Sequence, residues 1–402
     1  MNESLPSIQP FVRDRLTWLA YAMLAYIGFT QSMLGPLMPS LRSELSLNYT
    51  LGGFLPATLA IGLILSGLFS DWFARLWSRR VVFWMGGICL AACVVALGAS
   101  RQFELVLVAV LGMGFGSSLT QVMIQALLAD QHGEQRAIAF TEANVAASLS
   151  VMITPFIIAS LQSTYIGWRA ISILVIVFLV TLAVSFLRDH IPDGTPTQAQ
   201  SWTGASRLPF SFWLYWVVLF LVVAVEMSLA VWATDFLTNV AGLSRTNAAL
   251  AFSAFPAAML IGRIAGSRFT GRWSSTKFLL GSLVITLAGF LLFWLTRIAT
   301  LNILGLFMAG LGIANLYPLT LSIAVGLAAG QSNQASARVS LGVGTALLIV
   351  PLLLGWLADH LGLRNAYGIV VVLAITAMTI TVMSSRLPLK REEAVPLYSK
   401  IK

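Results

Sequence analysis

The sequence predicts an all-α membrane protein in which twelve transmembrane helices form two pseudo-symmetric six-helix bundles. Of its 402 residues, 58% are hydrophobic and only 10% are charged, and the mean hydropathy is +0.87. A soluble protein carries roughly 25% charged residues, so much of this surface must face lipid. The apolar residues are also grouped into runs of bilayer-spanning length, and the two halves of the chain repeat each other.

The apolar runs are separated by Gly, Pro or charged breaks, and a polar connector divides them into two groups of six. We expect spans at 16–38, 50–70, 80–99, 104–128, 137–161, 169–187, 210–236, 246–267, 277–296, 300–326, 337–358 and 365–384. The predicted domains are a bundle at 1–187, a cytoplasmic linker at 188–208, a second bundle at 209–385 and a basic cytoplasmic tail at 386–402.

The distribution of basic residues predicts the orientation of these spans. An even number of spans places both termini on one side, and the segments on that side hold 17 of the 24 Lys and Arg residues. The loops on the other side hold six, and only Arg263 lies inside a span. Basic residues favour cytoplasmic loops, so we expect cytoplasmic termini and a plasma (bacterial inner) membrane location. The net charge of +9 is spread thinly through short loops, which argues against a nucleic-acid partner.

Motifs recur between the halves at offsets of 195 to 200 residues. Pro56-Ala57 recurs as Pro256-Ala257, and Pro155 recurs as Pro351. A parallel repeat of six spans implies two bundles with a site between them at mid-depth.

The sequence offers little for enzymatic or metal chemistry. It has no zinc-type His/Glu spacing, phosphate loop or nucleophile–base pair, so we expect neither an enzyme nor a metal or organic cofactor. Cys89 and Cys93 lie one turn apart in an apolar run and are interpreted as packing residues. Asp235 and Asp359 fall at outer span ends, where we expect them to reach solvent. We expect the protein to be a monomer surrounded by membrane lipid.

One acidic residue lies near the middle of a span. Glu226 interrupts the run 210–236, and burying a carboxylate there costs at least ~2.5 kcal/mol. A proton, a cation, a buried partner or a water-filled cavity could each offset this cost. Acids inside a membrane are functional by default, so these possibilities favour transport over a purely structural role.

Several loop motifs resemble those of the major facilitator superfamily, and the resemblance covers nearly the whole chain. The matching segments are Gly67–Asp71 with Ser78–Arg80, Pro39 with Leu41–Glu44, and Ala129–Asp130 with Arg136. Gly112–Gly116, Ala126–Asp130 and Gly167–Arg169 are loosely similar to the fucose-permease-like branch. The resemblance implies a secondary transporter in which spans one, four, seven and ten line a central cavity.

Polar residues at mid-depth on those four spans are therefore the candidate substrate-binding residues. Besides Glu226, they are Gln31, Ser117, Gln121, Asn315 and Tyr317. Such side chains can hydrogen-bond a dehydrated solute, but they can equally bridge helices.

Glu226 is also the candidate proton-coupling residue, with a structural ion pair as the alternative. Within the superfamily architecture, spans five and eight meet across the halves, as do spans two and eleven. We therefore expect Glu142 with Arg263, and Asp71 with Arg338, to form a cytoplasmic gate when the cavity faces outward; the alternative is that each charge extends to water alone.

The expected function is proton symport of a small polar solute, sugar or organic acid-like, driven by the proton gradient. The first alternative is proton-coupled efflux of an amphipathic compound or drug. It is disfavoured because the arginine usual on span four of such antiporters is absent near Val108, and their Gly-Pro motif on span five is Thr154-Pro155. A lipid-handling or sensor protein on the same fold is the alternative from another class.

Overall fold

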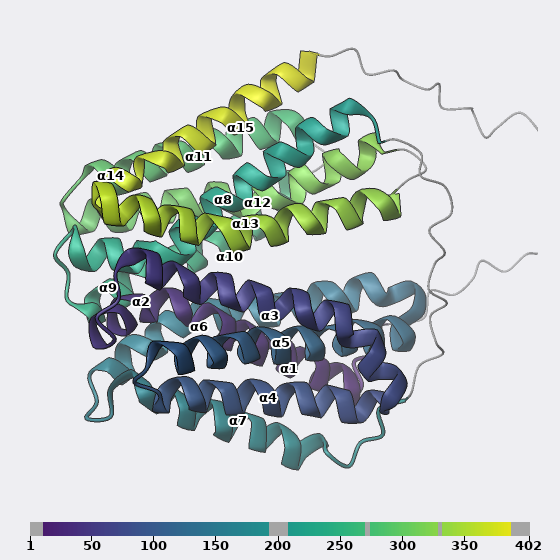
Figure 1. Cartoon of the computed structure of the whole chain (residues 1–402). Coiled ribbons are helices and arrows are strands. Elements are labelled where there is room, and N and C mark those ends of the chain that lie inside the picture. Colours follow the sequence, from purple (N-terminus) through teal and green to yellow (C-terminus); the bar gives the residue numbers. More distant parts are fainter. Residues whose placement is uncertain (1–10, 193–207, 270–273, 329–331, 387–402) are drawn as a thin grey trace, which may run out of the picture.

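A computed structural model describes residues 11–192, 208–269, 274–328 and 332–386 of the chain. These residues form helices and short connections, arranged as two bundles that lie side by side (Figure 1).

The first bundle contains helices α1 to α7. Their bounds are α1 (Arg15–Ser32), α2 (Leu34–Glu44), α3 (Tyr49–Leu76), α4 (Arg79–Ala99), α5 (Phe103–His132), α6 (Arg136–Gln162) and α7 (Ile171–Phe186), with single 3-10 turns before α6 and α7.

The second bundle contains helices α8 to α15. Their bounds are α8 (Phe210–Asn239), α9 (Arg245–Phe252), α10 (Ala254–Phe269), α11 (Ser275–Leu295), α12 (Ala299–Leu327), α13 (Ser332–Leu361), α14 (Leu363–Ala366) and α15 (Gly368–Arg386).

The described helices confirm an all-α fold of twelve crossings. Eleven of them are long and apolar enough to span a membrane within the described part of the chain. The remaining crossing, the first, is divided into α1 and α2, of 18 and 11 residues. The linker segment 193–207 and the tail 387–402 lie outside the described residues, so the domain boundaries stay predictions.

Proline explains where two crossings divide. Proline has no N–H for the bond to the carbonyl four residues earlier, and its ring clashes with that carbonyl. Four residues before Pro36 is Ser32, where α1 ends. Four residues before Pro256 is Phe252, where α9 ends. The same chemistry therefore bends the first and eighth crossings, both of which line the cavity described below.

The backbones of the two bundles approach each other closely at one end. We call the end where α1 begins and α15 ends the terminal side, and the opposite end the far side (Figure 1). Near the far side, a Cβ added to Gly35 would lie 2.1 Å from the carbonyl oxygen of Ala230, and one added to Gly53 would lie 2.6 Å from that of Pro351. Gly35 and Gly53 belong to the first bundle and their neighbours to the second, so this backbone approach holds the far side closed.

We expect valine at Gly35 or Gly53 to open the far side. A Cβ 2.1 Å from a carbonyl oxygen must move away by roughly 1 Å to reach ordinary contact, and the two bundles must separate to allow it. Double electron–electron resonance between spin labels on the far-side ends of α2 and α8 would then show longer distances than in the wild type.

Gly67 provides the control, since it lies in the same helix as Gly53 and a Cβ there would meet no atom within 4 Å. Gly67→Val should leave the distances unchanged. Unchanged distances in Gly35→Val as well would contradict the sealing role of these glycines.

Candidate functional site

A cavity of about 460 Å³ lies between the two bundles, within the 300 to 1,000 Å³ typical of small-molecule sites. It is bordered by α1, α2, α3, α5 and α6 from one bundle and by α8, α9, α10 and α13 from the other. Most of its lining is apolar. The polar side chains in the lining are Gln31, Ser32, Gln121, Asn144, Ser148, Glu226 and Arg263.

The cavity opens toward the terminal side. Its lining residues nearest the far side, including Leu34, Val231 and Phe252, are buried, whereas Asn144 and Arg263 near the terminal side are exposed. The closed end coincides with the close backbone contacts of Gly35. A solute could therefore enter this conformation from the terminal side.

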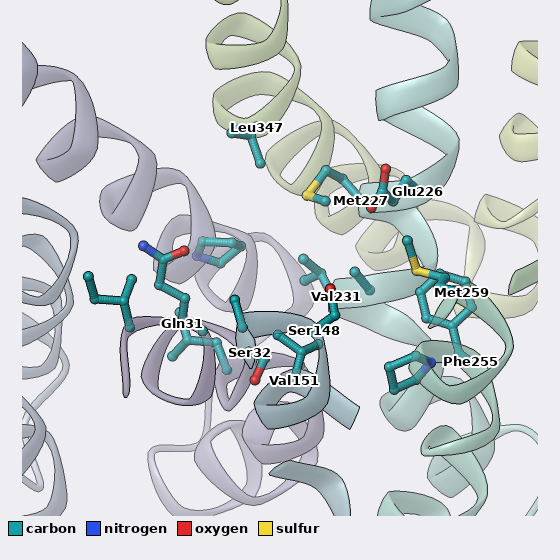
Figure 2. A pocket seen from close by; sticks show the side chains of 18 of the residues that line it. Gln31, Ser32, Ser148, Val151, Glu226, Met227, Val231, Phe255, Met259 and Leu347 are labelled. Atoms are coloured by element: carbon teal, nitrogen blue, oxygen red, sulfur yellow. The ribbon is translucent and has the colours of Figure 1, made fainter. Parts of the chain in front are cut away.

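Glu226 borders this cavity from α8, and its side chain is half-buried. It has no hydrogen-bond or ion-pair partner among the residues that the structure describes. Arg263 is close enough for its charge to act on Glu226, but the two side chains do not form an ion pair within 4.0 Å. Figure 2 shows Glu226 and Gln31 on opposite walls of the cavity.

Gln31 faces the cavity but also bridges two helices. Its Nε2 donates to Ser117 Oγ across 2.9 Å, and Ser117 is fully buried. The next residue, Ser32, also lines the cavity and donates from Oγ to Thr154 Oγ1 across 2.9 Å. Ser117 therefore bridges helices, which was one of its two predicted roles. Gln31 can both bridge helices and contact a solute in the cavity.

The other sequence-predicted polar residues lie in different settings. Gln121 on α5 lines the cavity. Asn315 on α12 donates from Nδ2 to the carbonyl oxygen of Gly262 across 3.0 Å, which joins α12 to α10. Tyr317 lies outside the lining, half-exposed, yet close enough to Glu226 for the carboxylate charge to act on its phenol. Solute contact by these three residues stays a prediction.

The first predicted gate pair, Glu142 and Arg263, has other partners in this conformation. Arg13 donates from Nε to Glu142 Oε2 across 2.8 Å, and Tyr21 donates from its hydroxyl to the same oxygen across 3.0 Å. Arg263 donates from Nη1 to Ser148 Oγ across 3.2 Å.

Of the second predicted gate pair, Arg338 is the member whose side chain the structure describes. The carbonyl oxygen of Arg338 accepts a hydrogen bond from Trp216 Nε1 at 2.8 Å, and the side chain of Asp71 lies outside the described side chains. Because the gate was predicted for a cavity open on the other side, both pairs stay predictions.

A buried ion pair joins the bundles at the far side and corrects the interpretation of Asp235. Its carboxyl was expected to reach solvent, but the residue is fully buried and accepts a hydrogen bond from Arg42 Nη1. Asn239 donates from Nδ2 to the other carboxylate oxygen across 2.8 Å. The Arg42 guanidinium lies 3.4 Å from the ring centroid of Tyr49, and these contacts tie α2 to α8 and α3.

A second far-side contact involves Asp359 at the end of α13. Its carboxylate accepts from the backbone N–H groups of Tyr49 and Thr50 across 2.8 and 2.7 Å. These are unpaired donors at the start of α3, where a negative charge is favourable. α13 of the second bundle therefore caps a helix of the first.

Ser32, Asn144 and Ser148 also line the cavity and were not among the predicted site residues. Asn144 and Ser148 lie four residues apart on α6. This i, i+4 spacing of polar residues within a predicted span marks one helical face and could have identified them.

A mid-depth cavity between two related six-helix bundles is the architecture of a secondary transporter. The chain belongs to the Major Facilitator Superfamily, whose family model matches residues 20–324 and 227–399. It is therefore an integral membrane transporter and not an enzyme. The superfamily resemblance is confirmed, while placement in the fucose-permease-like branch stays a prediction.

The chain is also similar to individual bacterial proteins. An uncharacterized MFS-type transporter of Yersinia pestis is 23% identical over 388 residues, covering 92% of this chain and 95% of that protein. A chloramphenicol resistance protein of Streptomyces lividans is 30% identical over 187 residues, 45% of this chain and 46% of that protein. The crystal structure of a bacterial homolog of the human lysosomal transporter Spinster, inward-facing and unoccupied, aligns with a TM-score of 0.76 and 15% identity, covering 93% of this chain and 97% of that one.

We expect Asp235→Asn to destabilise the closed far side. Removing one member of a buried ion pair leaves the other charge without compensation, which costs about 3–5 kcal/mol. Arg42 is the charge left behind, so the variant should unfold at a lower temperature and populate states with an open far side. A cysteine at Val231, with Cys89 and Cys93 replaced by alanine, would then react faster with a membrane-impermeant maleimide added from the far side.

Glu44→Gln is the matched control at the same side. Glu44 pairs with Arg169 across 2.6 Å within the first bundle, and both side chains are 30% exposed. This change should leave the labelling rate at Val231 unaltered. Equal labelling of the Asp235→Asn variant and the wild type would show that the pair does not hold the far side closed.

Proposed function

We propose that this transporter moves a small solute by alternating access, coupled to protons through Glu226, with both termini in the cytoplasm. The observation that carries the proposal is a carboxyl that borders the cavity without an ion-pair partner in the described part of the chain. An unpaired acid in such a place is functional by default, and an exchangeable proton offsets the cost of its burial.

The cavity favours a solute with hydrogen-bonding groups on an apolar body. Gln31 and Gln121 present amide groups from the first bundle. Met227, Phe255 and Met259 present apolar surface from the second (Figure 2). A sugar would leave most of that apolar wall without a matching surface. An organic acid of moderate size satisfies both walls.

Our first candidate is proton symport, which moves the solute into the cell. The second candidate is proton-driven efflux of an amphipathic compound. Two observations favour the second candidate: the apolar lining, and the partial similarity to a chloramphenicol resistance protein. The antiporter-type motifs missing from spans four and five favour the first. Vesicles with an imposed proton gradient, scored for the direction of flux, separate them.

Glu226→Gln should abolish proton-driven accumulation while preserving solute binding and exchange. One proton per solute and a gradient of one pH unit supply enough free energy for about tenfold accumulation, and the variant should fall to about onefold. The measurement is uptake into proteoliposomes of a solute found by thermal-shift screening, with counterflow exchange measured in parallel.

Glu104→Gln serves as the control, because Glu104 is an exposed acid in the first turn of α5 and lies outside the cavity lining. It should accumulate solute like the wild type. Full accumulation by Glu226→Gln would remove this residue from the coupling mechanism.

A further inference from the structure

Arg263 is the cationic side chain in the cavity lining, and no acid among the described residues forms an ion pair with it. It lies on α10, is exposed and borders the cavity near the terminal side. Its one hydrogen bond to a described side chain is the neutral contact with Ser148 Oγ at 3.2 Å. No Asp or Glu lies within 4.0 Å of its guanidinium among the described residues, so most of its five donor N–H groups remain available to a ligand.

The cavity wall next to Arg263 changes from polar to apolar with depth. Phe252, Phe255, Met259 and Arg263 follow one another at intervals of three and four residues, which places them on one face of the eighth crossing. Arg263 is the member nearest the terminal side. The other members supply apolar surface deeper in the cavity.

The facing helix α6 has the same gradient. Asn144, Ser148, Val151 and Pro155 follow at intervals of four, three and four residues and all border the cavity. Asn144 and Ser148 lie toward the terminal side, and Val151 and Pro155 lie deeper. Figure 2 shows Ser148 and Val151 across from Phe255 and Met259. The two helices therefore form a slot with a cationic, hydrogen-bonding mouth and an apolar interior.

We propose that this slot binds an amphipathic organic monocarboxylate, with its carboxylate on Arg263 and its apolar body between Val151, Phe255 and Met259. This assignment rests on the transport function proposed above and gives that function a substrate class. Beside the carboxylate position, Ser148 Oγ donates to the backbone carbonyl oxygen of Asn144, and Asn144 Nδ2 donates to that of Phe140, each across 2.8 Å. The second N–H of the Asn144 amide is therefore the neutral donor that remains for the carboxylate.

The chemistry of the slot selects a carboxylate over other head groups. A guanidinium presents two parallel N–H groups that match the two oxygens of a carboxylate, so the pair is bidentate and charge-assisted. A primary amine would be repelled by the same guanidinium. A neutral amide would displace the water around Arg263 without compensating its charge. A dianion would place a second negative charge beside apolar walls, where its desolvation is unfavourable.

The direct test is a binding comparison at fixed pH without any gradient. Hexanoate, octanoate and phenylacetate, each with its primary amide and primary amine, are titrated onto the purified full-length protein by isothermal calorimetry. We expect at least one acid to bind at least tenfold more tightly than its amide and amine. The proposal is overturned if no acid is preferred, or if an amine binds more tightly than its acid.

Variants at Arg263 then locate the preference. In Arg263→Gln the acid and the amide should bind within twofold of each other, while Arg263→Lys should retain part of the preference. Arg297→Gln, at an exposed arginine outside the cavity, should match the wild type. A gate-only role for Arg263 would weaken the acid and the amide equally, so a tenfold preference that survives in Arg263→Gln overturns the assignment.

The outcomes also separate this inference from the proposed proton coupling. Glu226→Gln should keep the acid-over-amide preference, because the carboxylate binds at Arg263. If proton-driven accumulation of another solute depends on Glu226 but carboxylates are not preferred, only the substrate assignment fails. If carboxylates bind through Arg263 but a proton gradient never drives their uptake, only the coupling fails.

Discussion

A carboxyl and a guanidinium border the same apolar cavity without forming an ion pair, and the proposed chemistry of this protein depends on that separation. Glu226 and Arg263 belong to different crossings of one bundle, α8 and α10, and the charge of one acts on the other. Had they met, each would have neutralised the other and the cavity would offer only hydrogen bonds. Kept apart, one group is available to a proton and the other to an anion.

The far side supplies the complementary constraint, because a cavity open at both ends would be a channel. There the structure uses the opposite arrangement: Arg42 and Asp235 are paired, and Asp235 is fully buried. Separating a buried pair is costly unless both charges reach water. Opening the far side hydrates both, which offsets part of that cost. An interface of this kind is stable when closed and still able to open, as alternating access requires.

Much of this architecture follows from the sequence because lipid imposes strict rules. Backbone groups in a bilayer must be satisfied within each segment, so the crossings are helical, and eleven of them in the described part of the chain can be recognised by their length and apolar composition. The divisions at Ser32 and Phe252 follow from Pro36 and Pro256. Glu226 was identifiable because an acid inside an apolar run has few structural explanations.

The sequence could not predict which way each polar side chain turns. Ser117 and Gln121 lie four residues apart on α5 and share a helical face, yet Ser117 is covered by the Gln31 amide while Gln121 borders the cavity. The difference arises from another helix, α1, that covers one turn of α5 but not the next.

The sequence also does not predict which charged residues at the ends of spans form ion pairs with each other. Arg42 and Asp235 each sit at the end of an apolar run, a position that normally reaches solvent. They meet because the glycine contacts draw α2 and α8 together at the far side. Composition gives the depth of a residue in the membrane, whereas its partner depends on how closely two backbones approach. The small residues that permit this approach are therefore the first place to search for ion pairs between bundles.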